Sequence, residues 1–342
     1  MNAIALYSGS TVLYWSALVI ALGAAAWLLL SRALYVTDGN DGSVLWIWFP
    51  LAVLLSVLLA RFLHWYCHTE QYPGFFAAMT QYSSGGYCLP GLLLGAWLAA
   101  VLMKRFRFVT SSARLLDALA PGAALGIAMI RLSALFTNAC RGKLVITKPF
   151  FQRLPFGSGL RTVSGVTEYR FATFFVEFLL LLALTVLLVR FFLRRRRRPM
   201  KYGPREGHVA RLFLLVFSAI DVVLDSTRYD SSFLRSNGFV SLTQIVGGLC
   251  LLALLVYYSR RSVRANGRRL YHWVLWLGWL LGLAAAGYLE YLVQRHGDWY
   301  LFCYSMMSLC VTLMALTVYA MYRTLCRPPR RGRRAAAADS VT

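Results

Sequence analysis

Four charged side chains interrupt apolar stretches of this sequence, and their types suit the binding of a phosphate group. Arg131 lies within the apolar stretch 114–136, while Glu177, Asp225 and Arg228 lie in or just after two later ones. A guanidinium group matches a phosphate through two parallel hydrogen bonds. Arginine within a membrane span costs roughly 2.5–3.5 kcal/mol, so it should face the protein interior and have a partner. The pattern indicates either ion pairs that fix helix packing or a site for an anionic headgroup, and we favour the site.

Helical periodicity indicates which of these side chains share a face. Asp117 and Arg131 are 14 positions apart, which at about 100° and 1.5 Å per residue places them within about 40° on one face and about 21 Å apart. Asp221, Asp225 and Arg228 form one polar stripe along their own helix. Arg228 can pair with Asp225 one turn away, and Arg131 is the expected partner of the stripe across the bundle.

The elements that position these side chains are predicted to be transmembrane helices. The chain has 342 residues, of which 59% are hydrophobic, whereas soluble domains average roughly 45–50%. A span needs roughly 17–25 mostly apolar residues, and such runs predict an all-α, polytopic transmembrane helix bundle. They lie near 11–34, 45–66, 87–103, 114–136, 171–193, 211–227, 239–258, 270–293 and 299–322.

The net charge of +23 could indicate nucleic-acid binding, but its distribution indicates membrane topology. Lys and Arg concentrate in alternate loops, at 104–114, 194–211 and 260–269, and in the tail after 326. The positive-inside rule makes these segments cytoplasmic and leaves the N-terminus outside and the C-terminus inside. The outer loop 137–170 nevertheless carries six basic residues, so we expect it to be structured and functional.

Cysteine and histidine give no firm indication of a metal or cofactor. The seven cysteines are dispersed without a metal-binding spacing. His64 and His68 share a helical face, as metal ligands can, but they end a span among aromatic residues, which favours an interfacial belt. Glu290, near the outer end of a late span, is likewise interpreted as interfacial.

The stretch from Asp117 to Arg131 carries a specific pattern, D-x-x-A-P-x-x-x-L-G-x-x-x-x-R. It resembles the fourth helix of the prolipoprotein diacylglyceryl transferase family. The segment Arg170–Glu177 resembles that family's R-F-P-x-Q-L-Y-E, and Asp225–Arg228 stands where the family has E-F-x-R. Arg61 fits its second helix, and the resemblance covers roughly residues 10–260.

The resemblance implies an enzyme of the bacterial cytoplasmic membrane. Such an enzyme moves a diacylglyceryl group from phosphatidylglycerol to the lipobox cysteine thiol of a prolipoprotein, without a cofactor or metal. The residues carried over as catalytic are Arg131, Glu177, Asp225 and Arg228, and those carried over as substrate-binding are Asp117, Arg61 and Asn138.

Several family positions differ in this sequence. The third-helix H-G-G reads Pro90-Gly91-Leu92, so the family histidine is absent, and the sixth-helix arginine reads Asp221. The polar run after Arg131 is replaced at Ser133, Ala134, Thr137 and Ala139. These changes suit an alternative, a catalytically inactive paralogue that binds phospholipid or a partner protein. A transporter is the weaker third reading, because interrupted helices in two repeated halves are not visible.

The chain divides into three predicted parts. Residues 1–260 form the transferase-like membrane domain, 261–325 an additional pair of transmembrane helices, and 326–342 a basic tail whose low-complexity composition predicts disorder.

Overall fold

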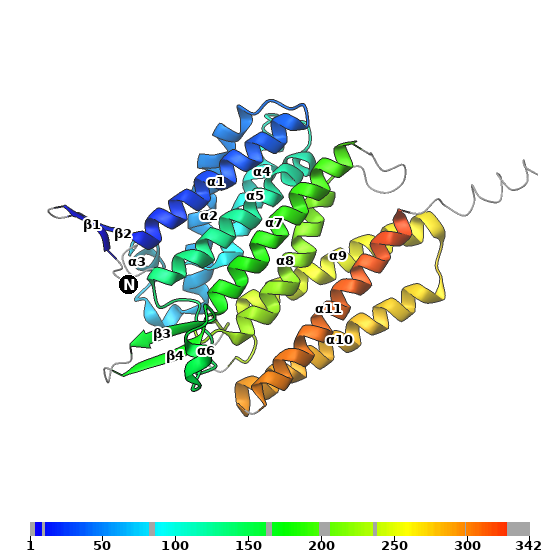
Figure 1. Ribbon diagram of the computed structural model, residues 1–342. Coiled ribbons are helices and arrows are strands. Elements are labelled where there is room, and N and C mark those ends of the chain that lie inside the picture. Colours follow the sequence, from blue (N-terminus) through cyan, green and yellow to red (C-terminus); the bar gives the residue numbers. More distant parts are fainter. Residues whose placement is uncertain are drawn as a thin grey trace, which may run out of the picture.

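Nine long helices form the molecule that Figure 1 shows, in the described residues of a computed structural model: 4–8, 11–81, 86–161, 166–197, 206–234, 238–297 and 299–326. Each corresponds to one predicted span. They are α1 (Trp15–Thr37), α2 (Val44–Cys67), α4 (Leu89–Arg105), α5 (Ser112–Ser133), α7 (Thr173–Arg197), α8 (His208–Thr227), α9 (Leu242–Asn266), α10 (Leu270–Arg295) and α11 (Tyr300–Leu325). The tail from residue 327 lies outside the described residues.

Seven of the nine helices are long and apolar enough, taken alone, to cross a membrane: α1, α2, α5, α7, α9, α10 and α11. The other two fall short for identifiable reasons. Helix α4 has 17 residues, and α8 carries three charged side chains at Arg211, Asp221 and Asp225. The predicted all-α transmembrane bundle is confirmed.

Small residues let α5 and its neighbours approach closely. A Cβ atom on Gly122 of α5 would lie 2.4 Å from Ser31 Oγ of α1. On α4, a Cβ atom on Gly91 would lie 2.4 Å from the Ala60 Cα atom of α2. Backbones in this kind of contact are typical of membrane helix pairs. Helix α5 is the central helix, because 67% of its 18-residue apolar stretch is buried, against 22% for the corresponding stretch of α1.

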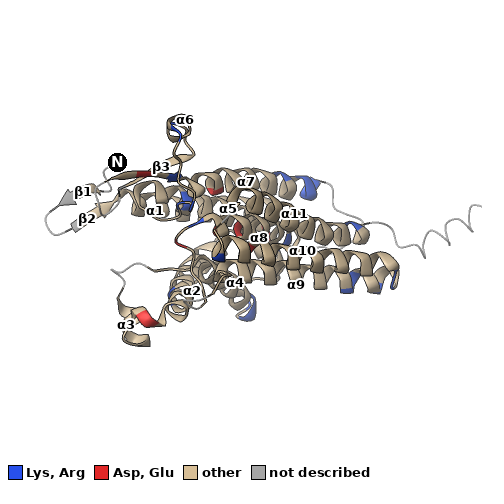
Figure 2. Ribbon diagram, turned by 90° about the horizontal axis from the view of Figure 1, so that it is seen from below, with Lys and Arg blue, Asp and Glu red and all other residues tan. Residues whose placement is uncertain are grey.

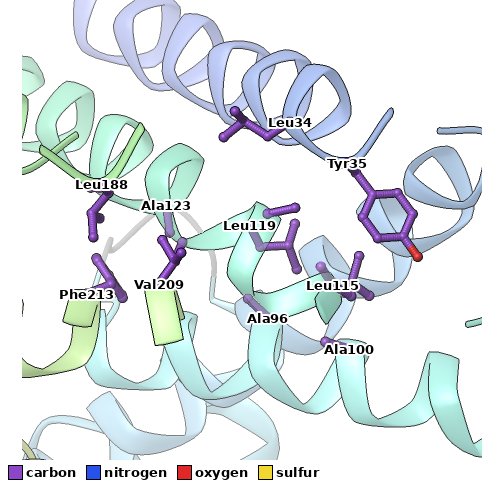
Figure 3. Packing of buried hydrophobic residues seen from close by; sticks show 14 of the residues in the cluster. Leu34, Tyr35, Ala96, Ala100, Leu115, Leu119, Ala123, Leu188, Val209 and Phe213 are labelled. Atoms are coloured by element: carbon purple, nitrogen blue, oxygen red, sulfur yellow. The ribbon is translucent and has the colours of Figure 1, made fainter. Parts of the chain in front are cut away.

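Two apolar cores meet at α8. The first joins α1, α2, α4, α5, α7 and α8, and Figure 3 shows part of it, including Leu119, Leu188 and Phe213. The second joins α8 and α9 to α10 and α11 through residues such as Trp279 and Met307. The additional helix pair therefore packs directly on the helix that carries the polar stripe.

The two ends of the bundle differ. At one end, here called the hairpin end, β3 (Gly157–Arg161) pairs antiparallel with β4 (Thr167–Phe171), and β1 (Ile4–Ser8) pairs with β2 (Thr11–Tyr14). The short helices α3 (Phe75–Thr80) and α6 (Pro149–Gln152) also belong to the loops there. At the opposite, basic end, Lys and Arg gather where α7, α9 and α11 finish (Figure 2).

The described residues of the loop 137–170, which are 137–161 and 166–170, are structured, as predicted. Beyond the β3–β4 hairpin, Gly142 forms a bridge with Arg228 and Val145 forms one with Arg170. The Lys143 backbone N–H donates to the Thr227 carbonyl over 2.8 Å. These bonds tie the loop to the end of α8, beside the polar stripe.

Candidate functional site

Arg131 lies in the last turn of α5 at the hairpin end, where it is 5% exposed. Its guanidinium group bridges two helices: Nε lies 2.5 Å from Oε2 of Glu177 on α7, and Nη2 lies 3.1 Å from Oδ1 of Asp221 on α8. The arginine thus faces the protein interior and pairs with the stripe on α8. The member of the stripe that it contacts is Asp221.

Arg228, the residue directly after α8, completes the cluster. Its Nη1 lies 3.3 Å from Asp225 Oδ1 and 4.0 Å from Glu177 Oε1, and its Nε lies 3.2 Å from Asp230 Oδ1. Glu177 therefore sits between both guanidinium groups. We call Arg131, Glu177, Asp221, Asp225, Arg228 and Asp230 the Arg131 cluster.

Asp230, a member of the cluster, and Cys140, which borders it, were missed as site residues by sequence reasoning. The Cys140 backbone N–H donates to Asp230 Oδ2 over 2.8 Å, and Arg131 Nη1 donates to the Cys140 sulfur over 3.4 Å. Cys140 has φ +56°, a conformation that few non-glycine residues adopt. Burial raises the pKa of the Cys140 thiol, so Cys140 is a neutral acceptor for Arg131 rather than a thiolate.

The charges in the Arg131 cluster do not balance. Two guanidinium groups face four carboxylates, so the cluster has a formal charge of −2 when every group is ionised. The side chains of Glu177 and Asp225 are only 2% exposed, and that of Asp221 only 8%. Asp230, at 27%, is the most accessible carboxylate.

Asp117 lies at the other end of α5 and is not part of the cluster. Its carboxylate accepts hydrogen bonds from the backbone N–H groups of Gly207 over 2.6 Å and Ala210 over 2.9 Å. These are the unsatisfied N–H groups at the start of α8. The structure therefore does not bring this pattern residue near Arg131, and its contacts explain it as a helix cap that joins α5 to α8.

Arg61 is 1% exposed and holds a separate loop. Its guanidinium donates to the carbonyl groups of Ala78, Gln81 and Gly86 over 2.6, 2.7 and 3.0 Å. It also lies 5.2 Å from the ring centre of Tyr72. The structure thus gives Arg61 a role in closing the loop after α2.

Asn138 lies at the rim of the Arg131 cluster. The residue is exposed, and its backbone carbonyl accepts a hydrogen bond of 2.7 Å from the Tyr229 hydroxyl. Tyr229 directly follows Arg228 in the chain. Of the three predicted substrate-binding residues, Asn138 is therefore the one that the fold brings beside the cluster.

A buried polar network extends from α8 to α10. Ser226, the neighbour of Asp225, donates to Glu290 Oε2 over 2.5 Å, and Gln294 donates to Glu290 Oε1 over 2.7 Å. Lys143 of the hairpin-end loop donates to Gln294 over 2.8 Å. Glu290 is 3% exposed, so its interpretation as an interfacial residue was wrong.

His64 and His68 stack with ring centres 4.3 Å apart. In the described parts of the chain, no group of three or more His, Cys, Asp or Glu residues is arranged to hold a metal ion.

Comparison with known proteins agrees with the pattern around Arg131. The model of the family named prolipoprotein diacylglyceryl transferase matches residues 3–256, which include every member of the Arg131 cluster and exclude α10 and α11. A search of curated proteins found no match. With a family match over most of its length and seven helices of spanning length, the chain is a multi-pass membrane protein that belongs to the prolipoprotein diacylglyceryl transferase family.

Proposed function

We propose that the protein transfers a diacylglyceryl group from phosphatidylglycerol to the lipobox cysteine thiol of a prolipoprotein, with the Arg131 cluster as the site. The observation that carries this proposal is that two arginines from separate segments, the buried Arg131 and the largely enclosed Arg228, share one carboxylate at one end of a family-matched bundle. The positive-inside rule assigns that end to the outer face of a bacterial cytoplasmic membrane, with the C-terminus inside.

The reaction needs stabilisation of a leaving phosphate and removal of a thiol proton. The lipobox sulfur attacks the glyceryl carbon that is bonded to the phosphate, the carbon–oxygen bond breaks, and glycerol phosphate leaves with the electron pair. Guanidinium groups stabilise the charge that develops on that oxygen. Arg228, whose side chain is 11% exposed against 6% for Arg131, meets the phosphate first.

We assign the role of proton acceptor to Asp230. A general base must come within hydrogen-bond reach of the thiol. Glu177 and Asp225 are too enclosed for this, since each side chain is 2% exposed, against 27% for Asp230. Their role is to hold the guanidinium groups in place, whereas the Asp230 carboxylate is open to an incoming peptide.

Membranes that contain the protein, incubated with labelled phosphatidylglycerol and a lipobox peptide, test this activity. We expect label in the peptide, and a loss of roughly 10²–10³-fold in rate for Arg228→Ala and for Asp230→Asn. Arg190→Ala, on an exposed part of α7, is the control. Absence of transfer by the wild type, with Arg131→Ala indistinguishable from it, would refute the catalytic proposal.

One observation favours a second candidate, a catalytically inactive relative that binds phospholipid or a partner protein. The arginines are already neutralised from within, because four carboxylates surround them, and one of these, Asp221, stands where the resemblance to the family places an arginine. An anionic headgroup must displace at least one of these carboxylates. Phosphatidylglycerol that co-purifies with the protein but is never consumed would support this candidate over the enzyme.

A further inference from the structure

We propose that a groove between α9 and α10, at the basic end, binds one anionic phospholipid molecule through four arginines. The groove has a volume of about 670 Å³ and lies at the opposite end of the bundle from the Arg131 cluster. Its rim contains Arg260 and Arg264 of α9, Arg268 of the connection and Arg269 at the start of α10. The proposal does not depend on the transferase activity.

The fold brings these arginines to both walls of the groove. Arg260 and Arg264 are one turn apart and share a face of α9. Gly267 then ends the helix with φ +76°, a conformation suited to glycine. Only three residues lie between α9 and α10, and Arg268 and Arg269 of this connection line the same groove as the α9 pair.

The rim carries uncompensated positive charge. None of the ion pairs formed by the described residues involves any of the four arginines. The lining of the groove contains no acidic residue. The charge therefore complements a phosphate, and basic pockets between transmembrane helices are typical binding sites for anionic headgroups.

The floor of the groove suits acyl chains. Trp273, Leu277 and Leu280 follow one face of α10 and are 68%, 59% and 50% exposed. Trp276 is held in place because its Nε1–H donates to Ser259 over 3.1 Å. Tryptophan below a cationic rim is the arrangement found at the boundary between headgroups and hydrocarbon. An apolar floor selects a lipid over a free phosphate ion.

The groove belongs to the part of the chain that is additional to the family. The family match ends at residue 256, before Arg260. One wall of the groove is α10, which also carries Glu290 at its other end. A phospholipid in the groove therefore fastens α10 to α9 at the basic end, while Glu290 fastens α10 to α8 at the hairpin end.

Photolabelling of the purified full-length protein tests the proposal at the groove itself. The probes are phosphatidic acid and phosphatidylcholine, each with a diazirine in an acyl chain, and labelled peptides are mapped by mass spectrometry. We expect phosphatidic acid to label residues 273–280 at least about tenfold more than phosphatidylcholine. The variant R260Q/R264Q/R268Q/R269Q should lose this preference.

Matched controls separate the groove from general surface charge. R190Q/R194Q/R196Q/R197Q removes the same charge from exposed positions of α7 and should keep the preference. R268Q/R269Q, which alters no residue inside a helix, should reduce it even if the fourfold variant does not fold. Equal labelling by both lipids, unchanged labelling of R268Q/R269Q, equal loss in the α7 control, or full competition by inorganic phosphate would each overturn the proposal.

Discussion

The two ends of the bundle use arginine in opposite ways. At the hairpin end the side chains of Arg131 and Arg228 are only 6% and 11% exposed, and each contacts at least two carboxylates. At the basic end Arg260 and Arg264 are exposed and face no acid in the lining of their groove. A buried charge has to be paired within the protein, whereas an exposed one stays free for lipid headgroups. Burial of an arginine thus decides whether it pairs with carboxylates of the protein or stays available to lipid headgroups.

The largest expected effect comes from breaking the pairing at the hairpin end. Arg131→Met leaves Asp221 buried without its cation and Glu177 with only the longer contact to Arg228, which should reduce the free energy of unfolding by about 3–5 kcal/mol. Denaturation in mild detergent measures this. The control Arg190→Met removes an exposed arginine of α7 and should change the free energy by less than about 0.5 kcal/mol. Equal effects would contradict the contrast between the two ends.

The next effect tests whether the buried network reaches α10. Glu290→Ala leaves Ser226 and Gln294 without their acceptor, at an expected cost of about 1–3 kcal/mol in the free energy of unfolding. Glu290→Gln keeps an acceptor for Ser226 and should cost less. Tyr288→Ala, at a position 62% exposed on the same helix, is the matched control. If Glu290→Ala is as stable as that control, α10 is not anchored through this network.

Asp117 is a buried acid near the basic end, so its substitution tests whether a buried charge at that end is also paired within the protein. Asp117→Ala removes the cap of α8 and should cost about 1–2 kcal/mol, while Asp117→Asn retains one acceptor and should cost less. Thermal unfolding measures both. Loss of phosphatidylglycerol binding at unchanged stability would instead support the substrate-binding role that the family resemblance assigned to Asp117.

The smallest effect concerns the partly exposed surface at the start of α5. Ser111 caps the helix and donates to Glu206, and this hydrogen bond lowers the pKa of the Glu206 carboxyl. Ser111→Ala should cost about 0.5–1 kcal/mol at pH 7. A carboxyl with a lowered pKa stabilises the fold above its ordinary pKa of about 4.3 and loses that contribution as the pH falls further. The difference between wild type and variant, followed by unfolding at pH 7 and pH 4, should therefore shrink on acidification.

The positions of the helices were predictable because lipid sets the length of an apolar run, and all nine runs are helices. The depth of Arg131, Glu177 and Asp225 followed from the same counting. Contacts that depend on loops did not, and so Asp230 and Cys140 were missed: the segment after α8 carries Asp230, and the loop after α5 brings Cys140 against it. Asp117 belonged to a matching pattern, yet only the packing of α8 shows what its carboxylate binds.

The order in which the helices are synthesised affects how α8 inserts into the membrane. This helix carries Arg211, Asp221 and Asp225, so lipid alone is a poor environment for it. Helices α5 and α7 precede it in the chain, and they hold Arg131 and Glu177 where α8 has to arrive. Arg131, the cation that pairs with Asp221, is therefore in the membrane before Asp221 leaves the ribosome. Helix α8 then inserts against helices that already carry the partner of its buried acid.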